Sequence, residues 1–205
     1  MKKLFIISLN RVDCLTLSGI VVSLIAMGVA LKGYFTLTLG LLFLTMLFDA
    51  FDGILARKFG LTRPFGRYLD GFADVLAYLV GPACVLYLWG FNNVFYSIVL
   101  IVFISSGIIR LSVFNEVGNI EEDDGKKYLG LPVFWATFVI GAAYLLGFIL
   151  PLWLLFPILA IVLIAYSIAM VHNTTYTKIT NPKLIFISFM SCVLFFFFLH
   201  LIGVH

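Results

Sequence analysis

The chain has 205 residues, of which 63% are hydrophobic and only 11% are charged. An average soluble domain carries about 25% charged residues, so this composition excludes an ordinary soluble protein. The net charge of +3 is too small to suggest a nucleic-acid partner. We therefore expect an all-α integral membrane protein in which residues 1–205 form a single transmembrane domain.

Seven apolar segments are long enough to cross a bilayer, which takes about 20 residues of helix. Residues 1–11 precede them and are expected to form a short interfacial helix whose basic residues lie at headgroup level. Residues 116–127 hold a cluster of acidic residues, for which we expect a solvated, mobile loop or, alternatively, a lid over a substrate site. The seven segments are 13–32, 34–57, 66–90, 93–115, 131–150, 152–171 and 182–203.

Basic residues are distributed unevenly between the two ends of these segments. Almost all lie in the N-terminal region or after the second, fourth and sixth segments, and Lys32 alone lies on the other side. Cytoplasmic loops of membrane proteins are enriched in Lys and Arg. We therefore expect a multi-pass protein of the cell membrane with a cytoplasmic N-terminus and, after seven spans, an external C-terminus.

Four aspartates lie within the second and third segments: Asp49, Asp52, Asp70 and Asp74. Each carboxylate costs about 2.5–3.5 kcal/mol at the centre of a membrane helix, so incidental polarity is a weak explanation. At about 100° per residue, each pair falls on one face of its helix, and the antiparallel helices bring both pairs to similar depth near the basic end. Facing carboxylates repel each other, and hard divalent cations such as Mg²⁺, Mn²⁺ or Ca²⁺ would neutralise them. We therefore expect a metal site at the cytoplasmic end of the bundle.

Small residues accompany the first pair of aspartates on the same helical face. Gly53 and Ala56 have almost no side chain, which lets a bulky ligand approach the helix closely. Arg57 follows directly and would provide a partner for phosphate.

The aspartates belong to a longer pattern with fixed spacing. The chain reads Asp49-Ala-Phe-Asp52-Gly53-Ile-Leu-Ala56-Arg57, followed by Gly66 after eight residues and then by Asp70 and Asp74. This resembles the signature of the CDP-alcohol phosphotransferase family, D-x2-D-G-x2-A-R-x8-G-x3-D-x3-D, at every specified position. The resemblance implies a six-helix core over 13–171, to which 182–203 adds one span. It also implies transfer of a phosphatidyl-type group from a CDP-activated lipid to an alcohol, with release of CMP.

The resemblance further implies a role for each aspartate. Asp49, Asp52 and Asp70 would hold one divalent cation, and Asp49, Asp70 and Asp74 would hold the second. The cations would be Mg²⁺ or Mn²⁺, with Ca²⁺ as a non-productive occupant. Asp74 would also act as general base toward the hydroxyl of the acceptor.

The family pattern extends to the nucleotide and to the assembly. Thr16 matches a threonine that many members carry at the start of the first span, whereas Asp13 stands where they carry an asparagine. The resemblance implies a homodimer. The residues that would contact the CDP-lipid are Thr16, Asp49, Gly53, Ala56, Arg57 and Gly66.

A second resemblance concerns the acceptor alcohol. The fourth segment ends in Gly107-Ile-Ile-Arg110-Leu-Ser112-Val-Phe114-Asn115, and Tyr128-Leu-Gly130-Leu-Pro132 leads into the fifth. An RLSxFN stretch followed by a GLP turn resembles the phosphatidylserine synthases within the family. This implies L-serine as acceptor and a phosphatidyl group, or its ether-lipid equivalent, as the group transferred.

Each residue of this region has a serine-binding interpretation and a structural one. Arg110 would bind the serine carboxylate through its planar fork of donors, or would form an ion pair with a signature aspartate. Asn115 and Tyr128 would orient serine, or would act as a helix C-cap and a membrane-interface anchor respectively. Lys126 and Lys127 would close over the site, or would be ordinary cytoplasmic basic residues.

Two other functions remain open. A related transferase could use glycerol phosphate or inositol phosphate, but a phosphorylated acceptor needs more basic residues than the later spans provide. A metal or ion transporter could use the aspartates as a transport site, but transporters often show internal repeats, and this chain shows none.

Overall fold

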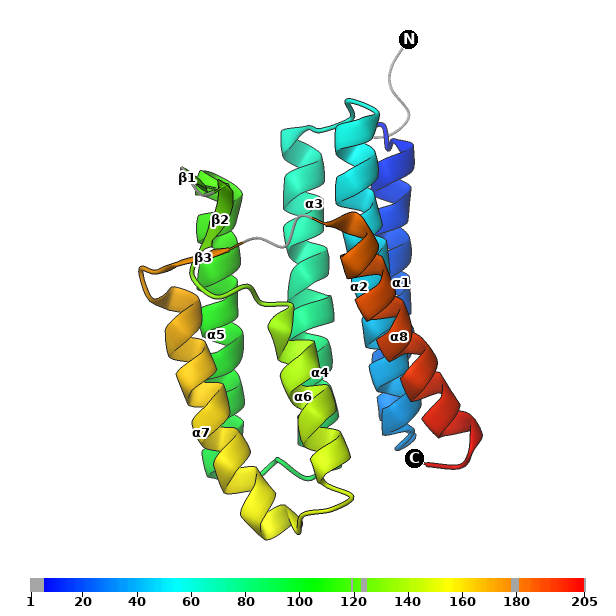
Figure 1. The fold of residues 1–205 in the computed structure, drawn as a ribbon, viewed down its shortest axis with the longest axis vertical. Coiled ribbons are helices and arrows are strands. Elements are labelled where there is room, and N and C mark those ends of the chain that lie inside the picture. Colours follow the sequence, from blue (N-terminus) through cyan, green and yellow to red (C-terminus); the bar gives the residue numbers. More distant parts are fainter. Residues whose placement is uncertain (1–5, 119, 123–124, 178–180, 205) are drawn as a thin grey trace.

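The computed structural model describes residues 6–118, 120–122, 125–177 and 181–204. Long helices run up and down in an antiparallel bundle, and a small three-stranded sheet lies across one end (Figure 1). The N-terminal region lies at this end and the last helix finishes at the opposite end. The chain therefore traverses the bundle an odd number of times, as the seven apolar segments predict.

The helices follow the predicted apolar segments. Three consecutive helical elements form one continuous helix of 26 residues, Pro64–Trp89, whose middle part is a π-helix. The helices are α1 (Arg11–Ala30), α2 (Phe35–Lys58), α3 (Pro64–Asp74), the π-helix η1 (Val75–Val80), α4 (Gly81–Trp89), α5 (Val94–Val117), α6 (Trp135–Leu146), α7 (Leu152–Val171) and α8 (Pro182–Leu201). The strands are β1 (Ile120–Glu122), β2 (Gly125–Leu129) and β3 (Thr175–Thr177).

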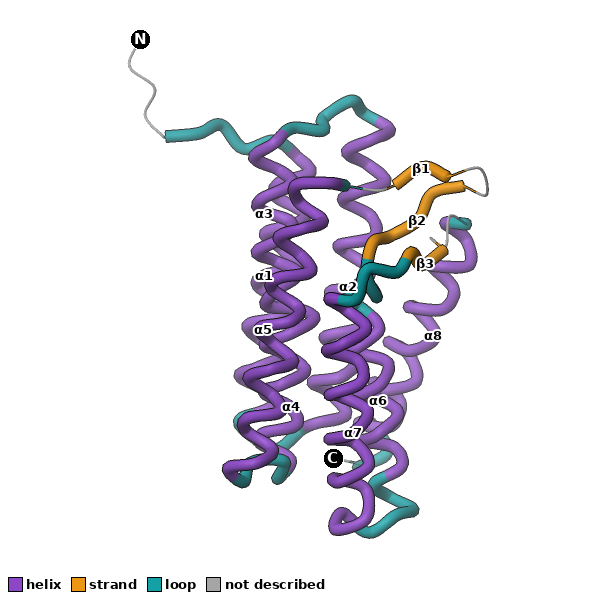
Figure 2. The backbone as a smooth tube through the Cα atoms, turned by 90° about the vertical axis from the view of Figure 1, so that its left-hand side faces the viewer, coloured by secondary structure: helices purple, strands orange, loops and turns teal. Residues whose placement is uncertain are grey.

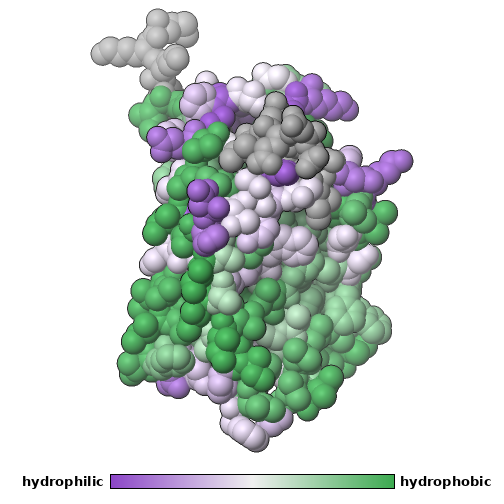
Figure 3. Space-filling model, turned by 60° about the vertical axis from the view of Figure 1, so that its left-hand side comes forward, coloured by the Kyte–Doolittle hydropathy of each residue, from purple (hydrophilic) through white to green (hydrophobic). Residues whose placement is uncertain are grey.

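Six of the described helices are long and apolar enough to cross a membrane. Figure 3 shows that apolar residues cover much of the lower part of one face, whereas hydrophilic residues gather toward the N-terminal end. This confirms the prediction of an all-α, multi-pass membrane protein.

The fifth predicted span, 131–150, is shorter than expected. Its helix, α6, has only 12 residues, which rise about 18 Å against roughly 30 Å for a bilayer core. The N–H groups of Gly130 and Leu131 donate to backbone carbonyls of Thr174 and of α7, at 2.9 and 3.0 Å respectively. Gly130 also has a φ of 71°, a backbone conformation that glycine adopts readily but that does not occur within an α-helix. The turn before α6 is therefore held by α7 and the segment that follows it, not by a helix of its own.

The predicted interfacial helix over 1–11 is not found among its described residues. Residues 6–10 form a bend and an extended segment, and the first five residues lie outside the described part of the chain. The side chain of Asn10 accepts hydrogen bonds from two N–H groups in the first turn of α1, and the Asn10 N–H donates to Asp13 Oδ2 at 2.7 Å. This reciprocal capping fixes the start of α1 and leaves the preceding residues extended.

The acidic segment 116–127, predicted as a loop, contributes strands to a sheet. β1 and β2 pair antiparallel, and β3, which lies between α7 and α8 in the chain, pairs with β2 so that Tyr176 lies opposite Tyr128. Figure 2 shows the strands side by side across the upper part of the bundle. The sequence prediction of a loop was incomplete because β2 depends on a partner strand almost 50 residues away in the chain.

The additional span predicted at 182–203 is α8, which packs along α2. Phe43 of α2 stacks on Phe196 of α8 with ring centroids 5.5 Å apart. The buried hydroxyl of Thr36 donates to the carbonyl oxygen of Val204 at 2.6 Å. These contacts make α8 an integral part of the bundle.

Candidate active site

A large cavity of about 1140 Å³ lies toward the hydrophilic end of the bundle. Most small-molecule pockets have volumes of about 300–1,000 Å³, so this one is large enough for a nucleotide with part of a lipid. Most of the predicted site residues contribute to its wall. They are Thr16, Asp49, Asp52, Gly53, Ala56, Arg57, Gly66, Asp70, Asp74, Arg110, Asn115 and Tyr128.

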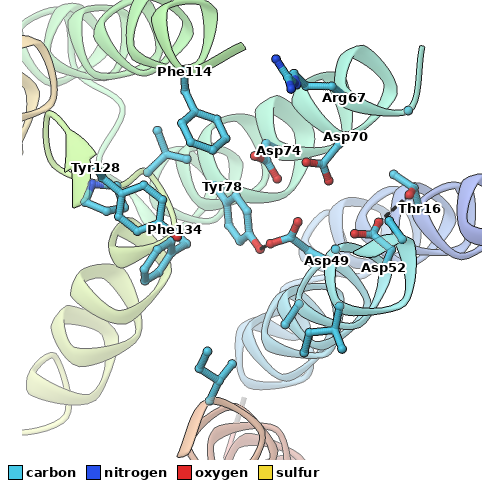
Figure 4. Close-up of a pocket in the computed structure, with 18 of the residues that line it drawn as sticks. Thr16, Asp49, Asp52, Arg67, Asp70, Asp74, Tyr78, Phe114, Tyr128 and Phe134 are labelled. Carbon is cyan, nitrogen blue, oxygen red and sulfur yellow. Dashed lines mark hydrogen bonds between the residues drawn. The ribbon is translucent and has the colours of Figure 1, made fainter. Parts of the chain in front are cut away.

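The aspartates of α2 and α3 meet across this cavity (Figure 4). Asp49, Asp70 and Asp74 each place a carboxylate oxygen within 4.8 Å of the other two. Asp70 Oδ1 is buried and has no hydrogen-bond partner among the described residues. An orphaned carboxylate oxygen beside two further carboxylates fits a hard divalent cation, which accepts oxygen ligands only. The helical phase predicted this convergence correctly.

Asp52 lies beside this trio and is held differently. Its side chain is 4% exposed, and Oδ2 accepts a short hydrogen bond from the hydroxyl of Thr16 on α1. Thr16 was predicted to contact the CDP-lipid, and the structure places its hydroxyl on Asp52. Thr16 therefore orients a signature carboxylate, while it also lines the cavity.

Tyr78, which lies in η1, was not predicted as a site residue. Its hydroxyl donates to Asp49 Oδ2 at 2.6 Å, and its ring lines the cavity (Figure 4). Its position four residues after Asp74 was an available signal, because residues four apart lie on the same helical face.

The small residues of the signature leave room for polar groups. A Cβ atom at Gly53 would lie 3.5 Å from Arg57 Nη1, and one at Gly66 would lie 3.7 Å from Asp13 Oδ1. Ala56, which lies between these two glycines in the sequence, also lines the cavity. Larger side chains at these positions would crowd both the charged groups and any ligand beside α2.

Asp13, whose role the sequence left open, is part of the scaffold. It is 2% exposed, completes the capping of α1, and pairs with Arg63 from the segment between α2 and α3. The two side chains form a salt bridge. Arg63 is thereby engaged away from the four signature aspartates.

Arg110 is buried and forms no salt bridge with a described residue. It is 5% exposed, and its Nε and Nη2 atoms have no hydrogen-bond partner within the described part of the chain. Its guanidinium lies over the rings of Phe114 and Tyr128, at 5.0 and 5.5 Å from their centroids. Arg110 forms no direct salt bridge with a signature aspartate among the described residues, although the charge of Asp74 acts on it over a longer distance. A buried guanidinium with unused donors fits an anionic ligand, because burying an unpaired charge is otherwise costly.

The other predicted acceptor residues differ in how they lie. Asn115 is inside α5, whose C-cap is Gly118, so the alternative role of Asn115 as a cap is wrong. Its side chain packs against Gly71, and its backbone carbonyl oxygen accepts a hydrogen bond from Arg67 Nη1 at 3.2 Å. It lines the cavity from the junction of α3 and α5.

Tyr128 is held in β2 at the edge of the cavity. Burial raises the pKa of Tyr128 to about 12, so its phenol stays protonated and able to donate near neutral pH. Side chains of successive residues in a strand point to opposite faces, so the side chains of Lys127 and Tyr128 lie on opposite faces of β2. Lys127 accordingly does not line the described part of the cavity. The side chain of Lys126 lies outside the described part of the structure. Tyr176 and Thr177 of β3 also line the cavity, and the sequence did not indicate them.

Comparison with known proteins supplies the family. The sequence model of the CDP-alcohol phosphatidyltransferase family matches residues 9–171. The chain belongs to this family. Its members use divalent metal ions, which agrees with the three clustered carboxylates. The matched region ends with α7, so α8 lies beyond it.

Several curated proteins are similar to this chain. It is 32% identical to the archaetidylserine synthase of Methanothermobacter thermautotrophicus over 142 residues, which cover 68% of this chain and 57% of that protein. It is 32% identical to the CDP-diacylglycerol–serine O-phosphatidyltransferase of Methanocaldococcus jannaschii over 187 residues, covering 89% and 81% respectively. The enzyme of the same name from Bacillus subtilis is 29% identical over 128 residues, covering 61% and 70%. The chain thus spans little more than half of the first of these relatives and about four fifths of the second.

Proposed function

We propose that the protein is a phosphatidylserine-type synthase formed by a single catalytic domain. It transfers a phosphatidyl group, or the ether-lipid equivalent, from a CDP-activated lipid to the hydroxyl of L-serine and releases CMP. The observation that carries this proposal is that one cavity holds both a cluster of carboxylates and a buried arginine whose Nε and Nη2 have no hydrogen-bond partner among the described residues. The names of the relatives point to the same acceptor.

The carboxylates would bind the divalent cations. Asp49, Asp52 and Asp70 would hold one, and Asp49, Asp70 and Asp74 the other, with Mg²⁺ or Mn²⁺ supporting turnover and Ca²⁺ occupying the site without turnover. When bound, the cations would neutralise the diphosphate and stabilise the leaving CMP. Thr16 would keep the Asp52 carboxylate oriented toward this site.

Asp74 would be the general base. Its carboxylate would take the proton from the serine hydroxyl as that oxygen attacks the phosphorus bound to CMP. Asp74 lies on α3 at the junction with η1, and its charge interacts with that of Arg110. A serine molecule between Arg110 and Asp74 would therefore present its hydroxyl to the base.

The CDP moiety would lie along α2. Gly53 and Ala56 would allow the nucleotide to approach the helix closely, and Gly66 would do the same from α3. Arg57 is exposed beside Gly53 and would bind a phosphate oxygen.

Serine would be recognised by its carboxylate. Arg110 would donate two parallel hydrogen bonds from the buried Nε and Nη2 atoms, which have no other partner among the described residues. Tyr128 and Asn115 would orient the rest of the molecule from β2 and α5. Lys126 would close over the site from the same strand, whereas Lys127 is directed to the other face of β2.

The apolar part of the cavity would hold the hydrocarbon chains of the donor lipid. Helices α6 and α8 face each other there through Phe138 and Phe189, whose ring centroids are 5.9 Å apart. The apolar wall consists of Phe134, Trp135, Phe138, Leu184, Ile185 and Phe189. The lipid would thus remain in contact with the membrane while its diphosphate reaches the aspartates.

The orientation in the membrane follows from the basic residues. Arg57, Lys58, Arg63 and Arg67 border the end of the bundle that contains the cavity. We infer that this end and the N-terminus face the cytoplasm, where serine is available. We also infer a homodimer, which the family resemblance implies.

A direct assay tests the acceptor. The full chain in lipid nanodiscs, with Mn²⁺ or Mg²⁺ and a CDP-activated lipid, is expected to release CMP with L-serine. Glycerol phosphate and inositol phosphate serve as matched acceptors, and EDTA or Ca²⁺ in place of Mn²⁺ serves as the metal control. Release of CMP with glycerol phosphate but not with serine would overturn the assignment.

A further inference from the structure

The hydroxyl of Tyr78 has a specific partner at the centre of the site. The side chain is 2% exposed, and the phenol donates to Asp49 Oδ2 at 2.6 Å. Figure 4 shows the ring reaching from the long helix of α3, η1 and α4 toward Asp49 on α2. The contact therefore joins the two helices that carry the four signature aspartates.

The backbone around Tyr78 is also unusual. Residues 75–80 form a π-helix that begins directly after Asp74. A π-helical turn contains one more residue than an α-helical turn, so the side chains within it are directed differently, and such turns often occur at functional sites. Here the turn directs the Tyr78 hydroxyl across to α2 while Asp74 remains in the carboxylate cluster.

The partner of Tyr78 is one of the clustered carboxylates. Asp49 contributes an oxygen to the group within 4.8 Å, together with Asp70 and Asp74. A hydrogen bond to one carboxylate oxygen fixes the rotation of the whole group, and residues that fix metal ligands in this way contribute strongly to metal affinity. Loss of the bond would remove one restraint on the Asp49 carboxylate, which the charges of Asp70 and Asp74 repel.

We propose that Tyr78 is a positioning residue that fixes the Asp49 carboxylate for divalent cation binding. This proposal rests on the metal site of the proposed function but not on serine as acceptor. Tyr78 would act through Asp49, and not directly on the phosphorus or on the acceptor hydroxyl.

The test is Mn²⁺ binding to the full chain, measured by electron paramagnetic resonance without CDP-lipid or serine. Tyr78→Phe removes the hydroxyl and keeps the ring, and we expect the Kd for Mn²⁺ to rise about 10- to 100-fold. We also expect CMP release by the variant to recover when Mn²⁺ is raised in the same proportion. A purely structural hydroxyl would show neither effect.

Tyr166→Phe provides a matched control. Tyr166 is also buried, and its hydroxyl donates to the Pro132 carbonyl at 2.6 Å, outside the carboxylate cluster. We expect a similar fall in Tm for both variants, but a Mn²⁺ Kd within about twofold of wild type for Tyr166→Phe only. An unchanged Mn²⁺ affinity in Tyr78→Phe would overturn the role of Tyr78 alone. Absence of Mn²⁺ binding by the wild-type chain would overturn the metal site as well.

Discussion

The cavity has two charged walls that are built in different ways. The carboxylate wall, Asp49, Asp52, Asp70 and Asp74, comes from two helices that follow each other in the chain. The arginine wall, Arg110 with Phe114 and Tyr128, comes from α5 and the strand β2. The first wall holds like charges that need cations, whereas the second holds a cation whose Nε and Nη2 have no partner among the described residues.

This difference separates the chemistry from the choice of substrate. Carboxylates fixed at helical spacing form a site for divalent cations and phosphoryl transfer, which serves any acceptor alcohol. A buried guanidinium framed by two aromatic rings selects a planar anion such as a carboxylate. Variants in the two walls should therefore affect different kinetic parameters.

The largest effect is expected from the carboxylate wall. Asp74→Asn removes the proposed general base, and we expect kcat for CMP release to fall by about 10³-fold at saturating Mn²⁺. Binding of the CDP-lipid, measured separately, should remain within about threefold of wild type because the nucleotide contacts lie on α2 and at Gly66. Activity near that of wild type would show that another group takes the proton.

A smaller and more selective effect is expected from the arginine wall. Arg110→Ala should raise the KM for serine about 30- to 100-fold, which corresponds to the loss of a charge-assisted hydrogen-bond pair. The KM for the CDP-lipid should change little. Arg110→Lys should recover only part of the loss, because an ammonium keeps the charge without the planar fork. Equal effects on both substrates would contradict a serine site.

Arg63 and Arg110 should differ in how much each contributes to the stability of the protein. Arg63→Ala leaves the buried Asp13 without its cation, and we expect the free energy of unfolding to fall by about 2 kcal/mol. This value is below that for a fully buried pair because the Arg63 side chain is 29% exposed. That corresponds to a fall in Tm of about 5 °C for a chain of this size. Arg110→Ala removes no ion pair, so its Tm should not fall by a comparable amount. Thermal unfolding of both variants by circular dichroism makes the comparison, and equal falls would mean that Arg110 has a structural partner.

The smallest effect is expected from the apolar part of the cavity. Ser188 of α8 is half-buried and lines the cavity, so Ser188→Trp should narrow the apolar part and raise the KM for the CDP-lipid about tenfold. Ile187→Trp is the matched control, since Ile187 is 61% exposed and points away from the cavity. The KM for serine should stay the same in both. An equal response of the two variants would exclude α8 from lipid binding.

Much of the fold was predictable because the bilayer restricts it. Backbone groups must be satisfied within each span, so apolar length alone located the long helices. The exception was α6, because the turn before it is satisfied by α7 and by Thr174, and no property of residues 131–134 indicates those partners. The sheet was missed for a related reason, since β2 and β3 are remote in the chain.

The sequence by itself determined the membrane class and the convergence of Asp49, Asp52, Asp70 and Asp74. Helical phase is a local property, and two helices joined by a short connection must lie side by side. Only the tertiary structure decided which arginine forms a salt bridge: Arg63 pairs with Asp13, whereas Nε and Nη2 of Arg110 have no hydrogen-bond partner among the described residues. It also decided that Tyr78 donates to Asp49. Such contacts depend on the distances between separate helices and on the π-helical turn, and neither can be predicted from residue spacing alone.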